Sequence, residues 1–503
     1  MSKQKKALKK YRKAISRETL LVDALLKHQQ DSQMVVNNPP DTLRLKCHDG
    51  GVHFGADPFD STGYVGKHQE DDGHIMVVGG PGCHKTTGIT LPTILTWQGT
   101  FVAVDVKGDI SDFCLRHQQE IAYPISIIDF TNHEHEYSVH FDPFLQLRQG
   151  GEDELLSNAR ELAISIVPLR DDDREPFWTL GAQNILTAII LYAVGKGLNF
   201  NTMIQMILHT PVEKLRKAIE GSGNNAARSF INQYPIDLSG SEDKTLRGSF
   251  IEAVNALHVF EDPNIQKVFE EQENSVNLNR DIQSGNFVIR IPESKISQWG
   301  GAVRLILRQL FSTLSQRPEK YSRAGRCQLP FLLLWDEMPR FGKFEDLPNA
   351  FSTLRSKNVT ICATVQSFAQ LDCIYGPSIR RVLVDCCAFL VIGAVQDVET
   401  QEYCSRLIGS CPVWEPSVGE NYYPSREEFT YNRNLNFCRK PIFYPEDFST
   451  LHDFIVATPF GKFCIKKNPL FEKPGLSLYR SNNRSIQQKG GYDFLELSGN
   501  FSR

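Results

Sequence analysis

Three short runs of the chain are apolar at nearly every position rather than at alternate positions. They are FLLLW (331–335), VTICATV (359–365) and AFLVIG (388–393). A strand that is apolar on both faces must be covered on both, as in a parallel sheet between two layers of helices. Earlier in the chain, the strand-like IMVV (75–78) enters a glycine-rich turn, and a helical stretch leads to the strand-like TFVAVD (100–105). This order of elements predicts an α/β fold with a mostly parallel sheet.

The length and composition limit the possible classes of protein. A chain of 503 residues can form two domains, or one large α/β domain with an inserted module. The formal net charge of -4 excludes a basic footprint over the whole surface, so a nucleic-acid partner would need a locally positive groove. The 12 cysteines include no C-x-x-C pair, which favours reduced thiols in a cytoplasmic protein.

The glycine-rich turn, GGPGCHKTTG (79–88), is similar to a phosphate-binding loop. In the pattern G-x-x-x-x-G-K-[ST], backbone N–H groups surround the phosphates, the lysine neutralises the β- and γ-oxygens, and the hydroxyl holds Mg²⁺. His84 stands where the second glycine is expected. Histidine tolerates a positive φ angle at some strain, so the loop remains a candidate, with a glycine-rich connecting turn as the rival interpretation. The residues predicted to bind the nucleotide are Gly79, Gly80, Pro81, Gly82, Cys83, His84, Lys85, Thr86 and Thr87.

An acidic pair, Asp336 and Glu337, directly follows the apolar run FLLLW. Sheets of this kind bind ligands at the carboxyl ends of their strands. An aspartate there can complete a Mg²⁺ shell together with Thr86, and the glutamate can polarise the water that attacks a γ-phosphate. Acidic pairs are common in loops, so the prediction depends on Lys85 lying nearby on a neighbouring strand.

Two more polar residues flank the run VTICATV. Gln366 follows it, where an amide could contact the γ-phosphate, and the alternative is a cap on the next helix. Arg355 precedes it in NAFSTLRSKNV and could reach a phosphate in a neighbouring subunit, with an ordinary surface arginine as the alternative. Together with Lys85 and Glu337, these two residues complete the predicted catalytic set.

In this order, the segments resemble the TraG-type coupling ATPases of conjugation and type IV secretion, over roughly residues 50–470. The most specific stretch holds the acidic pair, the arginine and the glutamine at close spacing. The segments that carry the resemblance are GGPGCHKTTGITLPTILTW, FVAVDVKGDI, YSVHFDPF (137–144), DREPFWTLGAQNILTAIILY, LLLWDEMPRFGKFEDLPNAFSTLRSKNVTICATVQSFAQLDCIYG and RKPIFYPEDF (439–448).

The resemblance implies a RecA-like P-loop ATPase with an inserted all-α domain, assembled as a homo-hexameric ring with nucleotide sites between subunits. It implies binding of ATP and Mg²⁺ by Lys85, Thr86 and Asp336, with Gln366 as the sensor and Arg355 as an arginine finger in trans. It further implies transfer of DNA, with single-stranded DNA favoured, or of protein–DNA substrate with relaxase-type proteins, to a type IV secretion channel.

Within the same resemblance, Asp105, Lys107 and Asp109 of VDVKGD match a strand-end motif for which a structural role is one interpretation. Two departures bear on function. His84 replaces a glycine that packs close to the phosphates in the family. Many relatives also have N-terminal transmembrane helices, whereas the longest strongly apolar run here, ILTAIILYAV (185–194), is about half the length that a bilayer crossing requires.

The first 17 residues hold eight Lys or Arg and no acid, so they can form a basic arm that meets a membrane, or a solvated arm. We therefore expect a cytoplasmic protein at the inner face of the membrane, held there by this arm or by a membrane partner.

Two other functions stay open: a double-stranded DNA translocase of the segregation or packaging kind, and a nucleotide-binding scaffold that hardly hydrolyses ATP because of His84. The predicted domains are a basic arm and linker (1–50), the nucleotide-binding domain in two parts (51–150 and 283–471), an all-α domain (151–282) and a flexible tail (472–503).

Two other groups carry weaker hypotheses. The segment TNHEHEYSVH offers metal-capable side chains at His133, Glu134, His135, Glu136 and His140, but a solvated loop is favoured because no second cluster accompanies it. Phe177 and Trp178 are expected to anchor the core of the helical region rather than to form a contact site.

Overall fold

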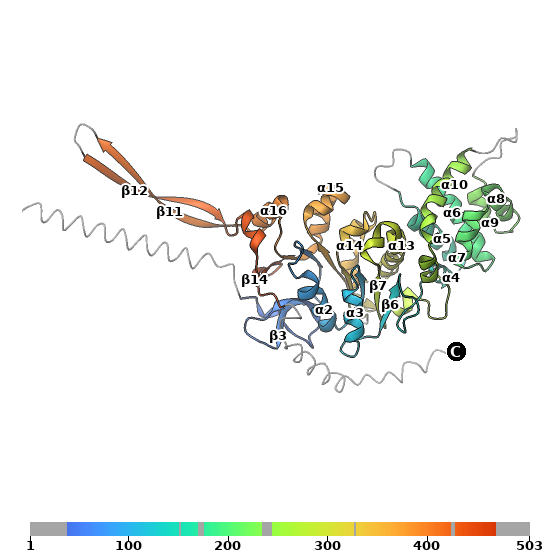
Figure 1. Cartoon of the computed structure of the whole chain (residues 1–503), viewed down its shortest axis with the longest axis horizontal. Coiled ribbons are helices and arrows are strands. Elements are labelled where there is room, and N and C mark those ends of the chain that lie inside the picture. Colours follow the sequence, from blue (N-terminus) through green and yellow to red (C-terminus); the bar gives the residue numbers. More distant parts are fainter. Residues whose placement is uncertain are drawn as a thin grey trace, which may run out of the picture.

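A computed structural model describes residues 38–149, 152–169, 176–233, 244–325, 328–423 and 428–468. The predicted basic arm and the tail from 472 lie outside these residues. The molecule is elongated, with a large sheet in its middle, a group of helices at one end and a β-ribbon that extends from the other (Figure 1).

The central sheet has nine strands in the order β14-β13-β10-β4-β9-β8-β5-β7-β6. The seven strands from β10 to β6 are parallel, and β13 and β14 add an antiparallel pair at one edge. All carboxyl ends of the parallel strands therefore meet at one edge of the sheet. The strands are β4 (His74–Val78), β5 (Thr100–Asp105), β6 (Ile125–Asp129), β7 (Asn286–Arg290), β8 (Phe331–Trp335), β9 (Val359–Val365), β10 (Cys387–Ile392), β13 (Phe454–Thr458) and β14 (Gly461–Ile465).

The central strands are apolar on both faces because alternate residues enter two separate hydrophobic clusters. In β8, Phe331, Leu333 and Trp335 belong to one cluster, whereas Leu332 and Leu334 belong to the other. One face is covered by α2 (Leu91–Thr96) and α3 (Asp109–Arg116). The other face is covered by α13 (Ile296–Ser315), α14 (Leu347–Thr353), α15 (Phe368–Asp385) and α16 (Val398–Ile408).

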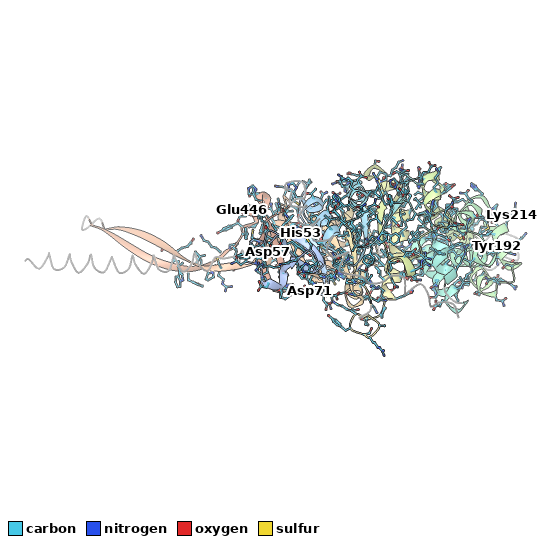
Figure 2. The ribbon with its side chains drawn as sticks, turned by 90° about the horizontal axis from the view of Figure 1, so that it is seen from below. His53, Asp57, Asp71, Tyr192, Lys214 and Glu446 are labelled. Carbon is cyan, nitrogen blue, oxygen red and sulfur yellow. The ribbon has the colours of Figure 1, made fainter. Side chains whose placement is uncertain are left out.

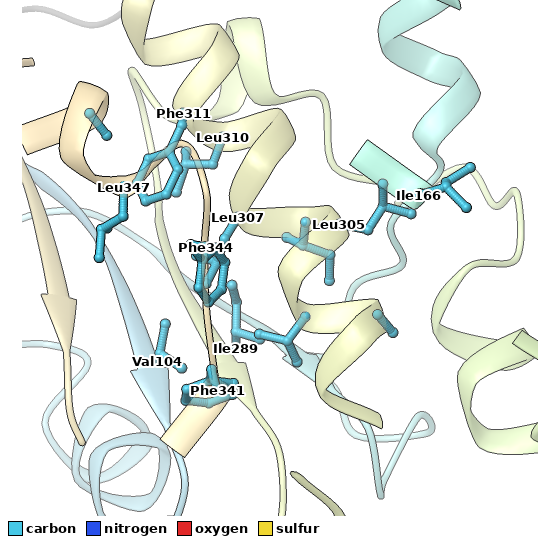
Figure 3. Packing of buried hydrophobic residues seen from close by; sticks show 14 of the residues in the cluster. Val104, Ile166, Ile289, Leu305, Leu307, Leu310, Phe311, Phe341, Phe344 and Leu347 are labelled. Carbon is cyan, nitrogen blue, oxygen red and sulfur yellow. The ribbon is translucent and has the colours of Figure 1, made fainter. Parts of the chain in front are cut away.

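Helix α13 shows how this second face is packed. Its apolar face, which includes Leu307, Leu310 and Phe311, is buried. Figure 3 shows these side chains in one cluster with Phe344, above Val104 of β5 and Ile289 of β7. The helix begins at Ile296 and ends at Ser315. It connects the sheet to the helical end of the molecule through the same continuous cluster.

Between β6 and β7, the described chain is almost entirely helical and forms the end of the molecule drawn in green in Figure 1. Asn199, Asn224 and Asp262 cap three of its helices by accepting hydrogen bonds from backbone N–H groups. The helices are α4 (Pro143–Gln149), α5 (Glu152–Ile166), α6 (Phe177–Gly195), α7 (Phe200–His209), α8 (Val212–Glu220), α9 (Asn225–Ile231), α10 (Lys244–Leu257), α11 (Pro263–Val268) and α12 (Leu278–Asp281).

Helix α6 is the one helix among the described residues that is long and apolar enough to cross a membrane, and 67% of its apolar window is buried inside the fold. The expectation that Phe177 and Trp178 anchor the core is wrong, since they are 57% and 37% exposed. They lie in the first turn of α6, where only part of each ring is covered. The ring of Trp178 lies on Gly248 of α10, where an added Cβ would come within 2.3 Å of it.

Two β structures were not predicted from the sequence. Strands β1 (Arg44–Lys46), β2 (Gly51–Ala56) and β3 (Gly63–His68) form a small antiparallel sheet beside α2, in a region expected to be partly linker. Strands β11 (Ser410–Tyr423) and β12 (Glu428–Pro441) form the two-stranded ribbon that extends from the body (Figure 1).

Candidate nucleotide-binding site

The loop after β4 lies between the carboxyl ends of β9 and β10, the two strands on either side of β4. The Gly79 amide donates to the carbonyl of Val365 at 3.1 Å, and the Gly80 amide donates to the carbonyl of Ala394 at 2.6 Å. A Cβ at Gly79 would lie 2.6 Å from the Cys83 sulfur, so the close turn requires glycine there. The loop therefore sits at the carboxyl edge of the sheet, where parallel sheets bind ligands.

His84 adopts φ 67°, the left-handed conformation that the glycine of the usual pattern would adopt without strain. Its carbonyl still accepts the Gly88 amide at 2.8 Å, and its Nδ1 lies 3.4 Å from the Thr87 hydroxyl. The histidine therefore fits the turn at the cost of local strain, as expected from the tolerance of this residue for positive φ.

Lys85 is the buried cation of the loop, and its side chain is 8% exposed. Its ammonium donates to the carbonyl of Gly79 and, at 3.1 Å, to that of Gly80. The loop thus holds the charge over its own concave backbone, where phosphate oxygens would be bound in a site of this type.

Thr86 and Asp336, 250 residues apart, meet at this edge. The Thr86 hydroxyl donates to Asp336 Oδ2 at 3.1 Å, and the Thr364 hydroxyl donates to Oδ1 at 2.7 Å. Burial raises the pKa of Asp336, while the hydrogen bonds from Thr364 and Thr86 oppose this effect. A hydroxyl beside a carboxylate is an oxygen pair suited to Mg²⁺. From the sequence, Lys85 is expected to follow a strand adjacent to that of Asp336. This expectation is wrong, because β9 separates β4 from β8.

Glu337 has a different orientation from Asp336, although the two are consecutive. Its backbone has φ 49°, and its amide donates to the Thr364 hydroxyl at 2.9 Å. Its side chain is ion-paired with Lys107, whose Nζ lies 3.2 Å from Oε1, and with Arg340 through Oε2. Strained backbone of this kind is concentrated at functional sites.

The motif VDVKGD has two distinct roles in the structure. Asp105 is 1% exposed and caps the following turn, accepting the amides of Gly108 at 2.9 Å and Ser111 at 2.7 Å. Asp109 lies in the first turn of α3. Asp105 is therefore structural, whereas the cap places Lys107 against Glu337.

Gln366 and Arg355 lie at opposite ends of β9. Gln366 follows its carboxyl end, next to Gly79, since Val365 pairs with Val78 of β4. Its backbone N–H donates to the side-chain oxygen of Gln370 at 3.1 Å. Arg355 lies in a 3-10 turn, η7 (Leu354–Lys357), before the amino end of β9 and is exposed. A seven-residue strand spans about 20 Å, so the fold does not bring Arg355 to the loop of its own chain.

His53 of β2 was not singled out by its sequence, yet it supports the helix that follows the loop. That helix begins with a π turn, η2 (Thr86–Thr90), and Pro92 has no N–H to donate into it. The Nδ1 of His53 lies 3.0 Å from the Gly88 carbonyl, and because a carbonyl only accepts, Nδ1 carries the proton. Complete burial lowers the pKa of His53 to about 4, which keeps the ring neutral.

The metal-capable side chains of TNHEHEYSVH, which all lie within the described residues, are not grouped as a metal site, the weaker of the two interpretations of this segment. Within the described parts of the chain, no group of three or more His, Cys, Asp or Glu is arranged to hold a metal ion. His140 Nδ1 instead lies 2.7 Å from the carbonyl of Lys267, which favours the loop interpretation.

Comparison with known proteins adds three findings. A family model described as "Type IV secretory system Conjugative DNA transfer" matches residues 6–455. The protein VirD4 of Rhizobium rhizogenes is 24% identical over 388 residues, and a probable conjugal transfer protein TraG of Sinorhizobium fredii is 23% identical over 380 residues. These alignments cover 76% and 74% of this chain but 55% and 58% of the relatives, so the chain spans little more than half their length.

Among solved structures, the conjugative coupling protein TrwB is similar in fold. An unbound form gives a TM-score of 0.58 at 18% identity, covering 80% of this chain and 87% of TrwB. TrwB "in complex with ADP and Mg2+" gives 0.56 at 17% identity, with 80% and 87% covered. This similarity confirms the predicted α/β class, a RecA-like P-loop fold with a mostly parallel sheet.

Proposed function

Because the chain belongs to the family of type IV secretory conjugative DNA-transfer proteins, we propose that it is an ATP-driven motor that delivers DNA to a secretion channel. The cargo we propose is single-stranded DNA, alone or joined to a relaxase-type protein. In the active form that we propose, six copies of the chain assemble as a homo-hexamer at the inner face of the membrane.

One observation carries the proposal. The Thr86 hydroxyl contacts Asp336 at 3.1 Å, and Thr86 directly follows Lys85, whose ammonium donates to the loop carbonyls of Gly79 and Gly80. Two segments far apart in sequence thus supply a cation, a hydroxyl and a carboxylate at the end of a glycine-rich loop. This combination is what binding of a magnesium-bound triphosphate requires. The similar protein TrwB has been solved with ADPNP and with ADP and Mg2+, which supports the same ligand class here.

The residues would divide the chemistry as follows. The loop from Gly79 to Thr87 and the Lys85 ammonium would bind the phosphates, and Thr86 with Asp336 would hold Mg²⁺. The ion would supply charge neutralisation at the phosphate oxygens. Glu337 accepts the proton of the attacking water, and Gln366, beside the loop, senses the γ-phosphate.

Arg355 is assigned a role in a neighbouring subunit. It is exposed and lies at the edge of the sheet opposite its own loop. In a ring, one subunit can present this edge to the nucleotide of the next, where a guanidinium would stabilise charge in the transition state. With Arg355 in this place, ATP hydrolysis should require that the subunits assemble into a ring.

The experiment uses the full chain and measures ATP hydrolysis across protein concentrations, without DNA, with single-stranded DNA and with duplex DNA. The variants are Lys85→Ala and Glu337→Gln, and a fluorescent ATP analogue reports binding. We expect Lys85→Ala to lose binding, and Glu337→Gln to bind but not turn over. Turnover equal to the wild type in Glu337→Gln would remove Glu337 from the mechanism.

The same assay separates the alternatives. Wild-type turnover no higher than that of Lys85→Ala would favour a nucleotide-binding scaffold. Stronger stimulation by duplex than by single-stranded DNA would favour a double-stranded DNA translocase. Turnover that rises steeply with protein concentration would support the ring.

A further inference from the structure

The side chain of Glu337 is held by two cations. Lys107, in the loop after β5, contributes its ammonium at 3.2 Å from Oε1. Arg340, three residues after Glu337 in the 3-10 turn η6 (Met338–Phe341), pairs with Oε2 and also with Glu293. Only 6% of Glu337 is exposed, so these pairs are shielded from water more than ordinary surface pairs are.

The ion pair with Lys107 directs Glu337 away from the phosphate-binding loop. The sheet order is β4-β9-β8-β5, so β5 lies on the side of β8 opposite the loop that follows β4. Asp336 turns the other way, toward Thr364 of β9 and Thr86 of the loop. The two consecutive carboxylates therefore point to different neighbours, and only Asp336 faces the nucleotide site.

The backbone at this point is fixed, so a change of orientation must come from the Glu337 side chain. Thr364 holds both residues, since its hydroxyl accepts the Glu337 amide at 2.9 Å and donates to Asp336 at 2.7 Å. Rotation about the side-chain bonds of Glu337 can move its carboxylate without disturbing either hydrogen bond.

Lys107 can release the carboxylate at low cost. Its side chain is 45% exposed, and it borders a surface cavity of about 570 Å³ that is also lined by Thr131 and Arg290. Partial burial lowers the pKa of Lys107, but the charge and hydrogen bond of Glu337, together with the charge of Asp336, raise it above its ordinary value, so the ammonium remains charged. The released side chain would move into water rather than into the core.

We propose that Lys107 is a positioning residue that holds Glu337 in a resting orientation, and that its release permits ATP hydrolysis. This inference rests on the proposed function. Hydrolysis requires the carboxylate to accept a proton from water as the water oxygen bonds to the γ-phosphorus and the bond to ADP breaks. A carboxylate paired with Lys107 is not in reach of that water, so the ion pair suppresses turnover without affecting nucleotide binding.

The test is Lys107→Met, which keeps an unbranched side chain and removes the charge. Arg340 remains, so Glu337 is not left as an unpaired buried carboxylate. Partly exposed ion pairs contribute up to about 1 kcal/mol, so we expect kcat without DNA to rise roughly two- to fivefold. KM, the affinity for the ATP analogue and the melting temperature should stay unchanged, and stimulation by DNA should shrink accordingly.

Two variants control the result. Lys107→Arg restores a cation and should return kcat to near the wild-type value, which a purely structural defect would not do. Lys214→Met makes the same change on α8, at the helical end of the molecule far from the sheet (Figure 2), and should leave kcat unchanged.

The outcomes distinguish this inference from the proposed function. If Glu337→Gln abolishes turnover while Lys107→Met lowers kcat or leaves it unchanged, the resting ion pair is refuted and the motor stands. If the double variant Lys107→Met with Glu337→Gln still turns over ATP, Glu337 is not the base, so the resting ion pair is refuted and Glu337 leaves the mechanism of the proposed motor. A rise in kcat that Lys107→Arg also produces would overturn the role of the charge.

Discussion

Thr364 offers the sharpest test of how the acidic pair is held. It is 1% exposed and is the last threonine of β9, between the strand of the loop and the strand of the acids. Its hydroxyl makes two hydrogen bonds, one to the backbone of Glu337 and one to the carboxylate of Asp336. Thr364→Val removes the hydroxyl and keeps the shape, whereas Thr364→Ser keeps the hydroxyl and removes a methyl group.

The expected cost follows from these two bonds. An unsatisfied buried N–H costs about 1–3 kcal/mol, and a hydrogen bond to a charged group is worth about 1.5–3 kcal/mol. Asp336 keeps the bond from Thr86, so we expect Thr364→Val to lose about 2–4 kcal/mol of folding stability. Thr364→Ser should lose about 1 kcal/mol, the value of one buried methyl group.

Thermal unfolding of the matched pair measures this difference. Domains of 150–250 residues lose about 2–4 °C per kcal/mol, so Thr364→Val should melt several degrees below Thr364→Ser. Thr364→Val should also need more Mg²⁺ for the same nucleotide affinity, because the carboxylate that we propose as the Mg²⁺ ligand, Asp336, is less well fixed. Equal melting temperatures for the two variants would refute the argument.

The pH dependence has a defined sign. Burial raises the pKa of Asp336 in the folded protein, and removing the Thr364 hydrogen bond raises it further. A carboxyl group with a raised folded pKa contributes its stability fully below the unfolded pKa, near 3.8, and loses it as the pH rises through the folded value. The deficit of Thr364→Val relative to Thr364→Ser should therefore be larger at about pH 7.5 than at about pH 5. A deficit that grows on acidification would contradict the assignment.

Two further predictions concern the loop and the subunit edge. His84→Gly removes left-handed strain of about 1–2 kcal/mol, partly offset by the greater freedom of glycine when unfolded, so titration with an ATP analogue should show equal or tighter binding. A large loss of affinity would mean that the imidazole contacts the nucleotide itself. Arg355→Ala should lose most ATP hydrolysis at protein concentrations where rings form, but the monomeric variant should bind nucleotide normally. The control Arg228→Ala, at an exposed position on α9, should change neither hydrolysis nor binding. A binding defect in monomeric Arg355→Ala would exclude action in trans.

The sequence predicted the class of the fold because its strands carry a strong local signal. The residues of β8, β9 and β10 are apolar on both faces, which only a covered sheet can accommodate. The order of the strands in the sheet carries no such local signal, because it depends on how the segments that connect the strands pack against the sheet. This is why Lys85 and Asp336 were expected on adjacent strands, whereas β9 separates them.

The small sheet was missed because of its glycines. Gly51 and Gly66 lie in strands β2 and β3, and glycine ordinarily argues against a strand. In the structure an added Cβ would lie 2.4 Å from the Lys67 carbonyl at Gly51 and 2.2 Å from the Val52 carbonyl at Gly66. The glycines are therefore required by close backbone contacts that local patterns do not reveal.

The sequence predicted that Asp336 and Glu337 act as one functional pair, whereas in the fold their side chains point to different neighbours. The hydroxyl of Thr364 fixes one carboxylate toward Thr86 and leaves the side chain of the other free to pair with Lys107. The pairing of Asp336 with Thr86 was predicted from their motifs, whereas the pairing of Glu337 with Lys107 was not, because it depends on which strand lies beside β8. Under the proposed function, the folded sheet supplies the groups that bind a magnesium nucleotide, whereas hydrolysis depends on one rotation of the Glu337 side chain.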